Sequence, residues 1–179
     1  MIIDFHHHLW NLGLRDYPWM SPELKPLYRN FLEDDLVKTV QSSHISGTVL
    51  VQAHQSLEET RWLLQISENS NLILGVVGWV DLKESNLEKM LEKLKGNLKF
   101  KGVRHLIQDE PDANWMLQPE VIRGLKVIHE AELTYDLLIK PHQIENALRL
   151  VDRLPEMPII LDHIAKPSIK AGIREPWAS

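Results

Sequence analysis

Short apolar runs alternate with amphipathic segments along this 179-residue chain, and this alternation restricts its fold more than any other feature. Six mostly apolar runs are predicted to be strands: residues 2–5, 48–52, 73–80, 102–107, 135–139 and 159–163. Five segments between them carry apolar residues at three- and four-residue spacing, as one face of a helix does: residues 33–44, 57–68, 86–98, 119–131 and 144–154. Strands that alternate with helices indicate an α/β fold with a parallel sheet.

Polar or charged side chains stand at the end of each predicted strand, and this pattern favours a barrel. In a (β/α)8 barrel the active site is built from the carboxyl ends of several strands. The alternative is an open doubly wound sheet, which commonly carries a glycine-rich phosphate loop after its first strand. The sequence contains no G-x-G-x-x-G motif and no P-loop. We therefore expect a (β/α)8 barrel.

The number of units is smaller than a complete barrel requires. A full barrel has eight βα units and about 250 residues, whereas six units are predicted here. We expect one domain, residues 1–179, that is a barrel truncated after about six units and incomplete at its C-terminus. Open strand edges attract further chains, so self-association through these edges is expected.

Composition excludes several classes of protein. The formal net charge of −5 and the lack of a basic stripe argue against a nucleic-acid partner. The absence of cysteine excludes a disulfide scaffold and a thiol nucleophile. No apolar run approaches the roughly 20 residues of a membrane span, and no signal peptide is recognised, so we expect a cytoplasmic protein without a membrane partner.

The run Asp4-Phe5-His6-His7-His8 closes the first predicted strand. Because successive side chains on a strand point to opposite faces, His6 and His8 should share one face and His7 should take the other. Two neighbouring imidazoles can bind a metal or a polarised oxygen. Three surface histidines or a purification tag are the alternatives, but the run is short and sits inside an apolar strand pattern.

Several motifs resemble one known family in the same order along the chain. They are D-F-H-H-H-L-W, R-D-Y-P-W-M, G-T-V-L-V-Q-A-H, G-V-V-G-W-V-D-L, K-G-V-R-H-L-I-Q and L-D-H-I-A-K-P. These segments resemble the amidohydrolase-related (amidohydrolase 2) proteins, and most of all the lactonase branch that acts on sugar lactones such as L-fuconolactone and L-rhamnono-lactone. The resemblance implies a (β/α)8 TIM barrel of the metal-dependent hydrolase superfamily and hydrolysis of a cyclic ester by water.

The resemblance also bears on cofactors. His6 and His8 match the family's strand-one H-x-H, and His163 matches its strand-six histidine, so these three would hold a divalent metal such as zinc if one is bound. Where a metal site would have another histidine on strand five, the chain has Tyr135-Asp136-Leu137. This departure favours the lactonase branch, whose members often need no cofactor. The family's strand-eight aspartate, a general base, would lie beyond Ser179, and impaired activity is expected on that ground.

Residues at strand ends supply the candidate site. We expect His6, His8, Arg104 and His163 to be catalytic, because ester hydrolysis needs donors that stabilise negative charge on the carbonyl oxygen. Two alternatives remain open: Arg104 as the structural partner of Asp136 or Asp162, and His163 as a core histidine. The expected substrate-binding residues are Gln52, Trp79 and Asp136.

Two other functions remain open. One is a metal-dependent hydrolase or decarboxylase of the same superfamily, which would require a bound divalent ion. The other is a non-catalytic, truncated paralogue that keeps the fold for association. The leading prediction is a lactonase-like hydrolase whose partner is a small-molecule lactone.

Overall fold

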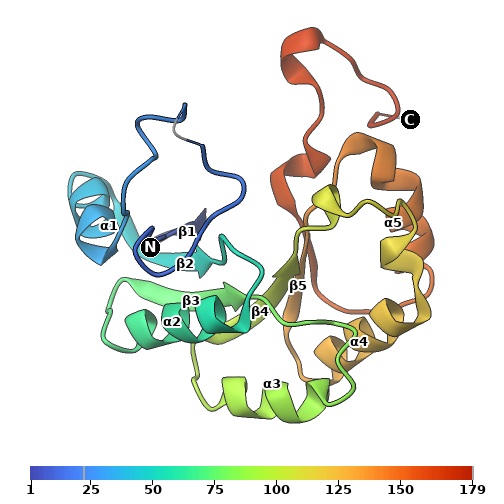
Figure 1. Ribbon diagram of the computed structural model, residues 1–179, viewed down its shortest axis with the longest axis horizontal. Helices are drawn as coiled ribbons and strands as arrows, with labels where there is room; N and C mark the ends of the chain where they lie inside the picture. Colours follow the sequence, from blue (N-terminus) through green and yellow to red (C-terminus); the bar gives the residue numbers. More distant parts are fainter. Residues whose placement is uncertain (22, 179) are drawn as a thin grey trace. The chain divides into compact units, whose positions relative to one another are not determined.

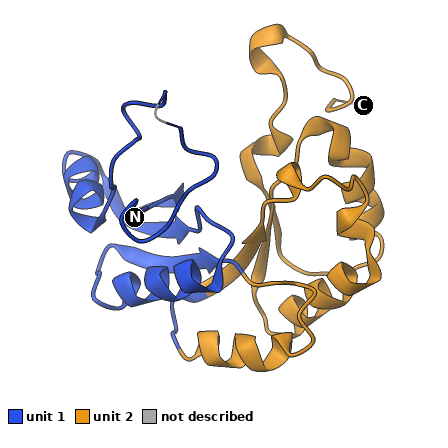
Figure 2. Cartoon of the chain, viewed as in Figure 1, with its two compact units in different colours: residues 1–79, 97–100 blue, residues 80–96, 101–179 orange. Residues whose placement is uncertain are grey.

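The computed structural model describes residues 1–21 and 23–178 and divides the chain into two compact units. The first unit comprises residues 1–79 and 97–100, and the second comprises residues 80–96 and 101–179 (Figure 2). Each unit combines parallel strands with helices. Across the described residues, no helix is both long and apolar enough to cross a membrane.

Three parallel strands form the sheet of the first unit (Figure 1). They are β1 (Ile2–His7), β2 (Ile45–Val51) and β3 (Ile73–Gly78), and they neighbour one another in sequence order. Helix α1 (Glu33–Val40) precedes β2, and α2 (Leu57–Glu68) packs along β3. Strand β2 is the central strand, and its Leu50 and Val51 are fully buried. The α2 side chains Leu63 and Leu64 complete this core.

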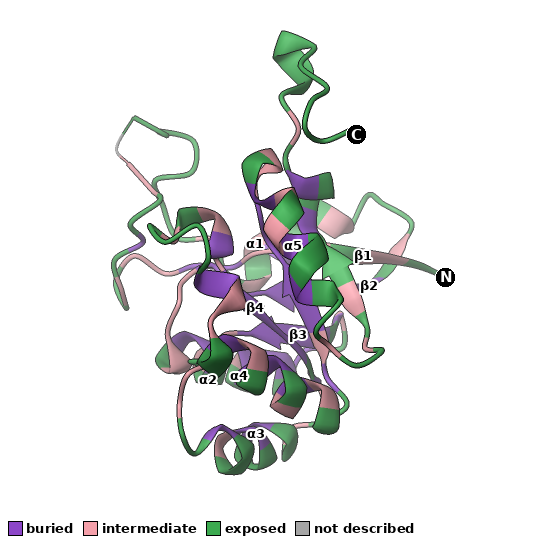
Figure 3. Cartoon of the chain, turned by 90° about the vertical axis from the view of Figure 1, so that its right-hand side faces the viewer, coloured by how far each residue is buried: buried purple, intermediate pink, exposed green. Residues whose placement is uncertain are grey.

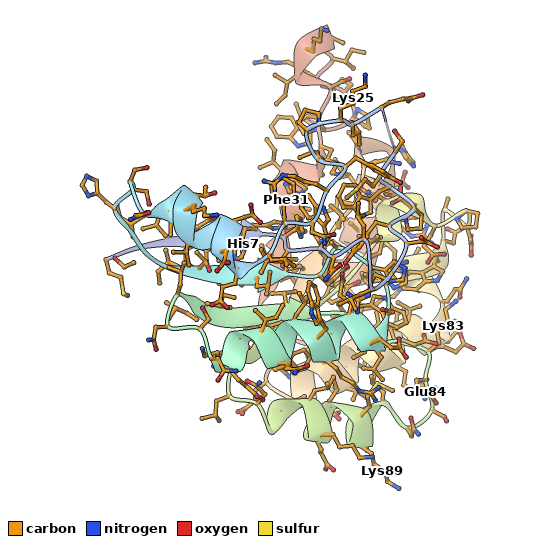
Figure 4. The ribbon with its side chains drawn as sticks, turned by 60° about the vertical axis from the view of Figure 1, so that its left-hand side comes forward. His7, Lys25, Phe31, Lys83, Glu84 and Lys89 are labelled. Carbon is orange, nitrogen blue, oxygen red and sulfur yellow. The ribbon has the colours of Figure 1, made fainter. Side chains whose placement is uncertain are left out.

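Helix α2 begins where its sequence predicts. The Ser56 hydroxyl accepts a hydrogen bond from the backbone N–H of Glu59 at 3.1 Å, which caps the first turn. The long connection between β1 and α1 is closed by two backbone hydrogen bonds of 3.0 Å between Trp10 and Phe31. Phe31, labelled in Figure 4, also packs on the Trp10 ring with centroids 4.6 Å apart.

The second unit repeats the alternation of helix and strand. Its elements are α3 (Leu87–Lys95), β4 (Phe100–His105), α4 (Pro119–Glu130), β5 (Thr134–Leu137), α5 (Ile144–Val151) and β6 (Ile159–Leu161). The first residue of β4, Phe100, is assigned to the first unit, and the rest of the strand belongs to the second. Strand β5 pairs in parallel with β4 and with β6. Val103 and Tyr135 of the strands are fully buried. Figure 3 shows β4 coloured as buried, whereas much of α3 and α4 is coloured as exposed.

Helix α4 is held closely against the segment that precedes α3. The Arg123 guanidinium donates hydrogen bonds to the carbonyl oxygens of Lys83 and Glu84, at 2.8 and 3.3 Å, and both of these residues are labelled in Figure 4. Beside it, Gly124 lies so close to Leu82 that a Cβ atom at this position would be 2.1 Å from the Leu82 carbonyl oxygen. Glycine is therefore required for the approach of the two segments.

Every predicted strand and helix is present, and the differences lie at the ends. Helix α2 has the predicted bounds, whereas α1 ends at Val40 rather than at residue 44. Strand β6 ends at Leu161, two residues earlier than predicted. It ends there because the backbone then enters a left-handed turn, which the pattern of apolar residues does not encode.

Candidate functional site

The histidines of β1 are arranged as strand alternation predicts. The Nε2 atoms of His6 and His8 lie 3.2 Å apart, and the two rings meet edge to face with centroids separated by 4.9 Å. His7 makes a different contact, with its Nε2 3.0 Å from the Thr48 hydroxyl oxygen. Burial lowers the pKa of His7 to about 4, although the Asp4 carboxylate opposes this shift. His7 is thus a neutral, structural neighbour of the His6–His8 pair.

The hydrogen bond of His8 to the backbone determines which of its nitrogens carries the proton. His8 Nδ1 lies 2.8 Å from the Val51 carbonyl oxygen. Since a carbonyl oxygen only accepts, Nδ1 must carry a proton, and in the neutral ring Nε2 then presents a lone pair toward His6. A backbone contact of this kind is the usual outer support of a metal-binding histidine.

The geometry of the pair fits a divalent metal. Two nitrogen ligands on a tetrahedral zinc ion, each about 2.0–2.1 Å from the metal, are about 3.3 Å apart. The 3.2 Å between the Nε2 atoms of His6 and His8 agrees with this separation. The same pair could alternatively direct one N–H toward a polarised oxygen, because imidazole both donates and accepts.

Glu59 lies behind the carboxyl end of β2 and was not among the predicted site residues. It is fully buried, and its Oε2 accepts the backbone N–H groups of Ala53 and His54 at 2.9 and 2.6 Å. Burial raises the pKa of Glu59, although the two backbone hydrogen bonds oppose the shift. The spacing of Ser56 and Glu59 at a helix start is the sequence signal that could have identified this residue.

The predicted substrate-binding residues of the first unit follow their strands directly. Gln52, after β2, is buried and its backbone N–H donates to the Val77 carbonyl oxygen at 2.8 Å. Trp79, after β3, is partly exposed, and both its backbone N–H and its carbonyl oxygen lie 2.8 Å from the Thr60 hydroxyl oxygen. These contacts place the two residues at the strand ends, and their binding of a substrate stays a prediction.

In the second unit, Arg104 has the structural partner that we considered as an alternative. Its guanidinium lies 3.0 Å from Asp162 Oδ2, and both side chains are almost fully buried, at 4% and 1% exposure. Asp136, predicted to bind substrate, stands opposite Arg104 in the register of β4 and β5 and is also buried. Arg104 is therefore oriented by Asp162.

His163 lies outside β6, so its placement by strand alternation was wrong. Four consecutive residues have left-handed backbone conformations, with φ between 49° and 58°: His163, Ile164, Ala165 and Lys166. The backbone N–H of Lys166 donates to the His163 carbonyl oxygen at 2.9 Å and closes this turn. Each such residue costs about 1–2 kcal/mol, so the surrounding contacts must stabilise the turn. His163 is exposed rather than a core histidine.

His105, the last residue of β4, packs against a neighbouring loop. Its ring stacks on Trp115 with centroids 4.0 Å apart and an angle of 16° between the planes. Its Nε2 lies 2.6 Å from Glu110 Oε1. Burial lowers the pKa of His105, and the contact with Glu110 opposes this shift. The residue has a packing role behind β4.

Comparison with known proteins assigns the family. The sequence profile described as "Amidohydrolase" matches residues 3–179. The chain belongs to the amidohydrolase family. It is 34% identical over 98% of its length to a protein from Burkholderia ambifaria named L-fucono-1,5-lactonase, and 30% identical to a protein of the same name from Burkholderia multivorans. The chain covers 60% of the length of each of these two relatives.

Solved structures of amidohydrolases share the fold. A crystal structure from Burkholderia multivorans with bound HEPES matches 97% of the chain with a TM-score of 0.90 and 29% identity, and the match covers 60% of that structure. A second crystal structure from that organism contains bound zinc and matches 93% of the chain with a TM-score of 0.88 at 30% identity, covering 59% of that structure. The predicted fold class, that of TIM-barrel amidohydrolases, is confirmed.

Proposed function

We propose that this amidohydrolase opens a sugar-type lactone by attack of water on the ester carbonyl. The observation that carries the proposal is the paired geometry of His6 and His8 at the end of β1. Support comes from the two relatives of at least 30% identity, which are both named L-fucono-1,5-lactonase. Water adds to the carbonyl carbon, the ring C–O bond breaks, and a hydroxy acid forms, which releases a proton near neutral pH.

The residues of this chain would act on the carbonyl group and on the hydroxyl groups of the lactone. His6 and His8 would stabilise the negative charge that develops on the carbonyl oxygen, with His8 donating from Nε2 in its imidazolium form, because oriented donors at this position lower the barrier. Arg104, held in place by Asp162, would donate hydrogen bonds to a lactone oxygen. Gln52, Trp79 and Asp136 would bind the sugar hydroxyls and ring.

A divalent metal is a second possibility at the same pair, favoured by the 3.2 Å separation of the two Nε2 atoms. His6 and His8 would hold the ion, which would supply a Lewis acid. The chelator test is direct: the protein is dialysed against EDTA, its zinc content is measured, and zinc is added back. Loss of hydrolysis on chelation and recovery with zinc would support the metal-dependent enzyme; unchanged hydrolysis would support the metal-free one.

The proposed activity is tested with L-fucono-1,5-lactone, by titrating the acid that hydrolysis releases. The chain should hydrolyse this lactone or a related aldonolactone above the spontaneous rate. His8→Gln should lower kcat/KM by at least about 100-fold, as loss of a transition-state donor typically does. His44→Gln, at an exposed position, is the matched control and should have no effect. No acceleration with any aldonolactone, or equal activity of His8→Gln, would contradict the proposal.

A further inference from the structure

A group of polar side chains in the second unit gathers at the carboxyl ends of β4, β5 and β6. Gln108 and Asp109 follow β4, Lys140 follows β5, and Lys166 follows β6. We call these four residues the lysine cluster. Because the three strands are parallel, these segments emerge at one end of the unit's sheet (Figure 1). Active sites of barrel enzymes are built at this end.

The left-handed turn determines where Lys166 lies. Its closing bond joins the backbone N–H of Lys166 to the His163 carbonyl oxygen. The turn therefore holds the backbone of Lys166 beside that of His163. The Lys166 ammonium reaches Gln108 Oε1 at 2.6 Å. Strained backbone of this kind is concentrated at functional sites.

The carboxylates near Lys166 are already engaged by other cations. Asp162 pairs with Arg104 at 3.0 Å, and Asp109 pairs with Lys140 at 3.4 Å. Among the residues that the structure describes, Lys166 has no carboxylate within ion-pair distance, and its hydrogen-bond partner is the neutral amide of Gln108. An ammonium group held by a neutral amide retains the ability to bind an anion.

The charges around Lys166 favour such an anion. Lys140 and Arg104 are the nearby cations, and Asp109 and Asp162 are the nearby carboxylates. Because each of these carboxylates is already paired with one of these cations, an added negative charge would offset the repulsion between the cations. The Lys140–Asp109 pair is 43% and 55% exposed, so a bound anion can readily displace it.

We propose that Lys166, supported by Gln108 and Lys140, binds the carboxylate of a polyhydroxy acid at the active face. The inference deepens the proposed function, because opening a lactone creates such a carboxylate. A carboxylate already present on the lactone has the same chemistry. Whether the carboxylate belongs to the product or to the lactone, the group that binds it is distinct from the pair of histidines on β1.

The test measures binding of L-fuconate to the folded chain by isothermal titration calorimetry, which requires no turnover. Lys166→Met should raise the dissociation constant about tenfold or more, as loss of a charged hydrogen bond does. Lys166→Arg should largely preserve binding, and Lys140→Met should weaken it by a smaller factor. Lys170→Met, at an exposed lysine in the next short helix, is the matched control. Circular dichroism checks that each variant is folded.

Two kinetic comparisons distinguish the sources of the carboxylate. If Lys166→Met weakens inhibition by L-fuconate but leaves hydrolysis of L-fucono-1,5-lactone unchanged, the lysine binds the product. If it lowers kcat/KM selectively for glucaro-1,4-lactone, which carries a free carboxylate, the lysine binds the substrate.

Failure of the inference differs from failure of the proposed function. Equal binding of L-fuconate by Lys166→Met and the unsubstituted chain would overturn the inference even if lactones are hydrolysed. The absence of measurable binding would overturn it as well. Binding that depends on Lys166, without hydrolysis of any lactone, would support the inference and contradict the proposed function.

Discussion

The guanidinium of Arg104 lies 3.0 Å from the Asp162 carboxylate, with both side chains almost completely excluded from solvent. The two residues are 58 positions apart in the sequence and join the end of β4 to the turn that follows β6. Each charge compensates the other, because an unpaired charge in this environment would be strongly unfavourable. The pair thus connects the packing of the second unit to the orientation of a candidate catalytic residue.

Asp162→Asn should lower the free energy of unfolding by about 3 kcal/mol, because it leaves a buried guanidinium without its countercharge. Urea unfolding followed by circular dichroism measures this change. The control is Asp109→Asn, at the exposed pair with Lys140, where a loss of less than about 1 kcal/mol is expected. Equal effects of the two substitutions would show that burial of the Arg104–Asp162 pair has no energetic consequence.

Glu59→Ala should destabilise the protein by about 3 kcal/mol, since the backbone N–H groups of Ala53 and His54 lose their buried acceptor. Glu59→Gln keeps one carbonyl acceptor and should lose less. The neighbouring Glu58 is exposed, so Glu58→Ala is the matched control with a small expected effect. Thermal and urea unfolding measure the series, and a larger loss in Glu58→Ala would refute the assignment.

His105 should make stability depend on pH in the mildly acidic range. Burial lowers its folded-state pKa below the unfolded value of about 6.5, so the unfolded chain binds the proton first as the pH falls. The stability present above pH ~6.5 is therefore lost as the pH falls toward the folded-state pKa. His105→Gln should lose less stability than the unsubstituted chain between pH 7.5 and 5.5.

The measurement for His105 is the urea midpoint at these two pH values, with His44→Gln as the exposed control. An identical pH response of His105→Gln and the unsubstituted chain would mean that His105 does not titrate differently in the two states.

Gly124→Ala should destabilise the second unit by about 3 kcal/mol, because the added methyl group would overlap the Leu82 carbonyl oxygen and force α4 to shift. Gly96→Ala is a useful comparison, since Gly96 has helical dihedral angles and its nearest obstacle is the Lys93 carbonyl oxygen at 3.1 Å. A much smaller effect is expected at Gly96. Thermal denaturation of both variants decides whether the close approach of α4 is rigid.

The sequence by itself determined the order and type of the elements. Apolar residues recur with a period close to 3.6 in α2 and α5 because one face must be buried, and the apolar run of β2 reflects a strand buried on both faces. The opposite directions of His6 and His7 also followed from the sequence, because the pleat of a strand has a period of two. These properties depend on local geometry alone.

Only the tertiary structure decided the details of the candidate site. The ion pair of Asp162 with Arg104 depends on the end of β6, where strand periodicity ceases to apply. The left-handed turn from His163 to Lys166 opposes the local preference of every residue in it, so packing must stabilise it. Glu59 likewise reads as a surface residue of a helix, and its burial follows from two backbone N–H groups that need an acceptor.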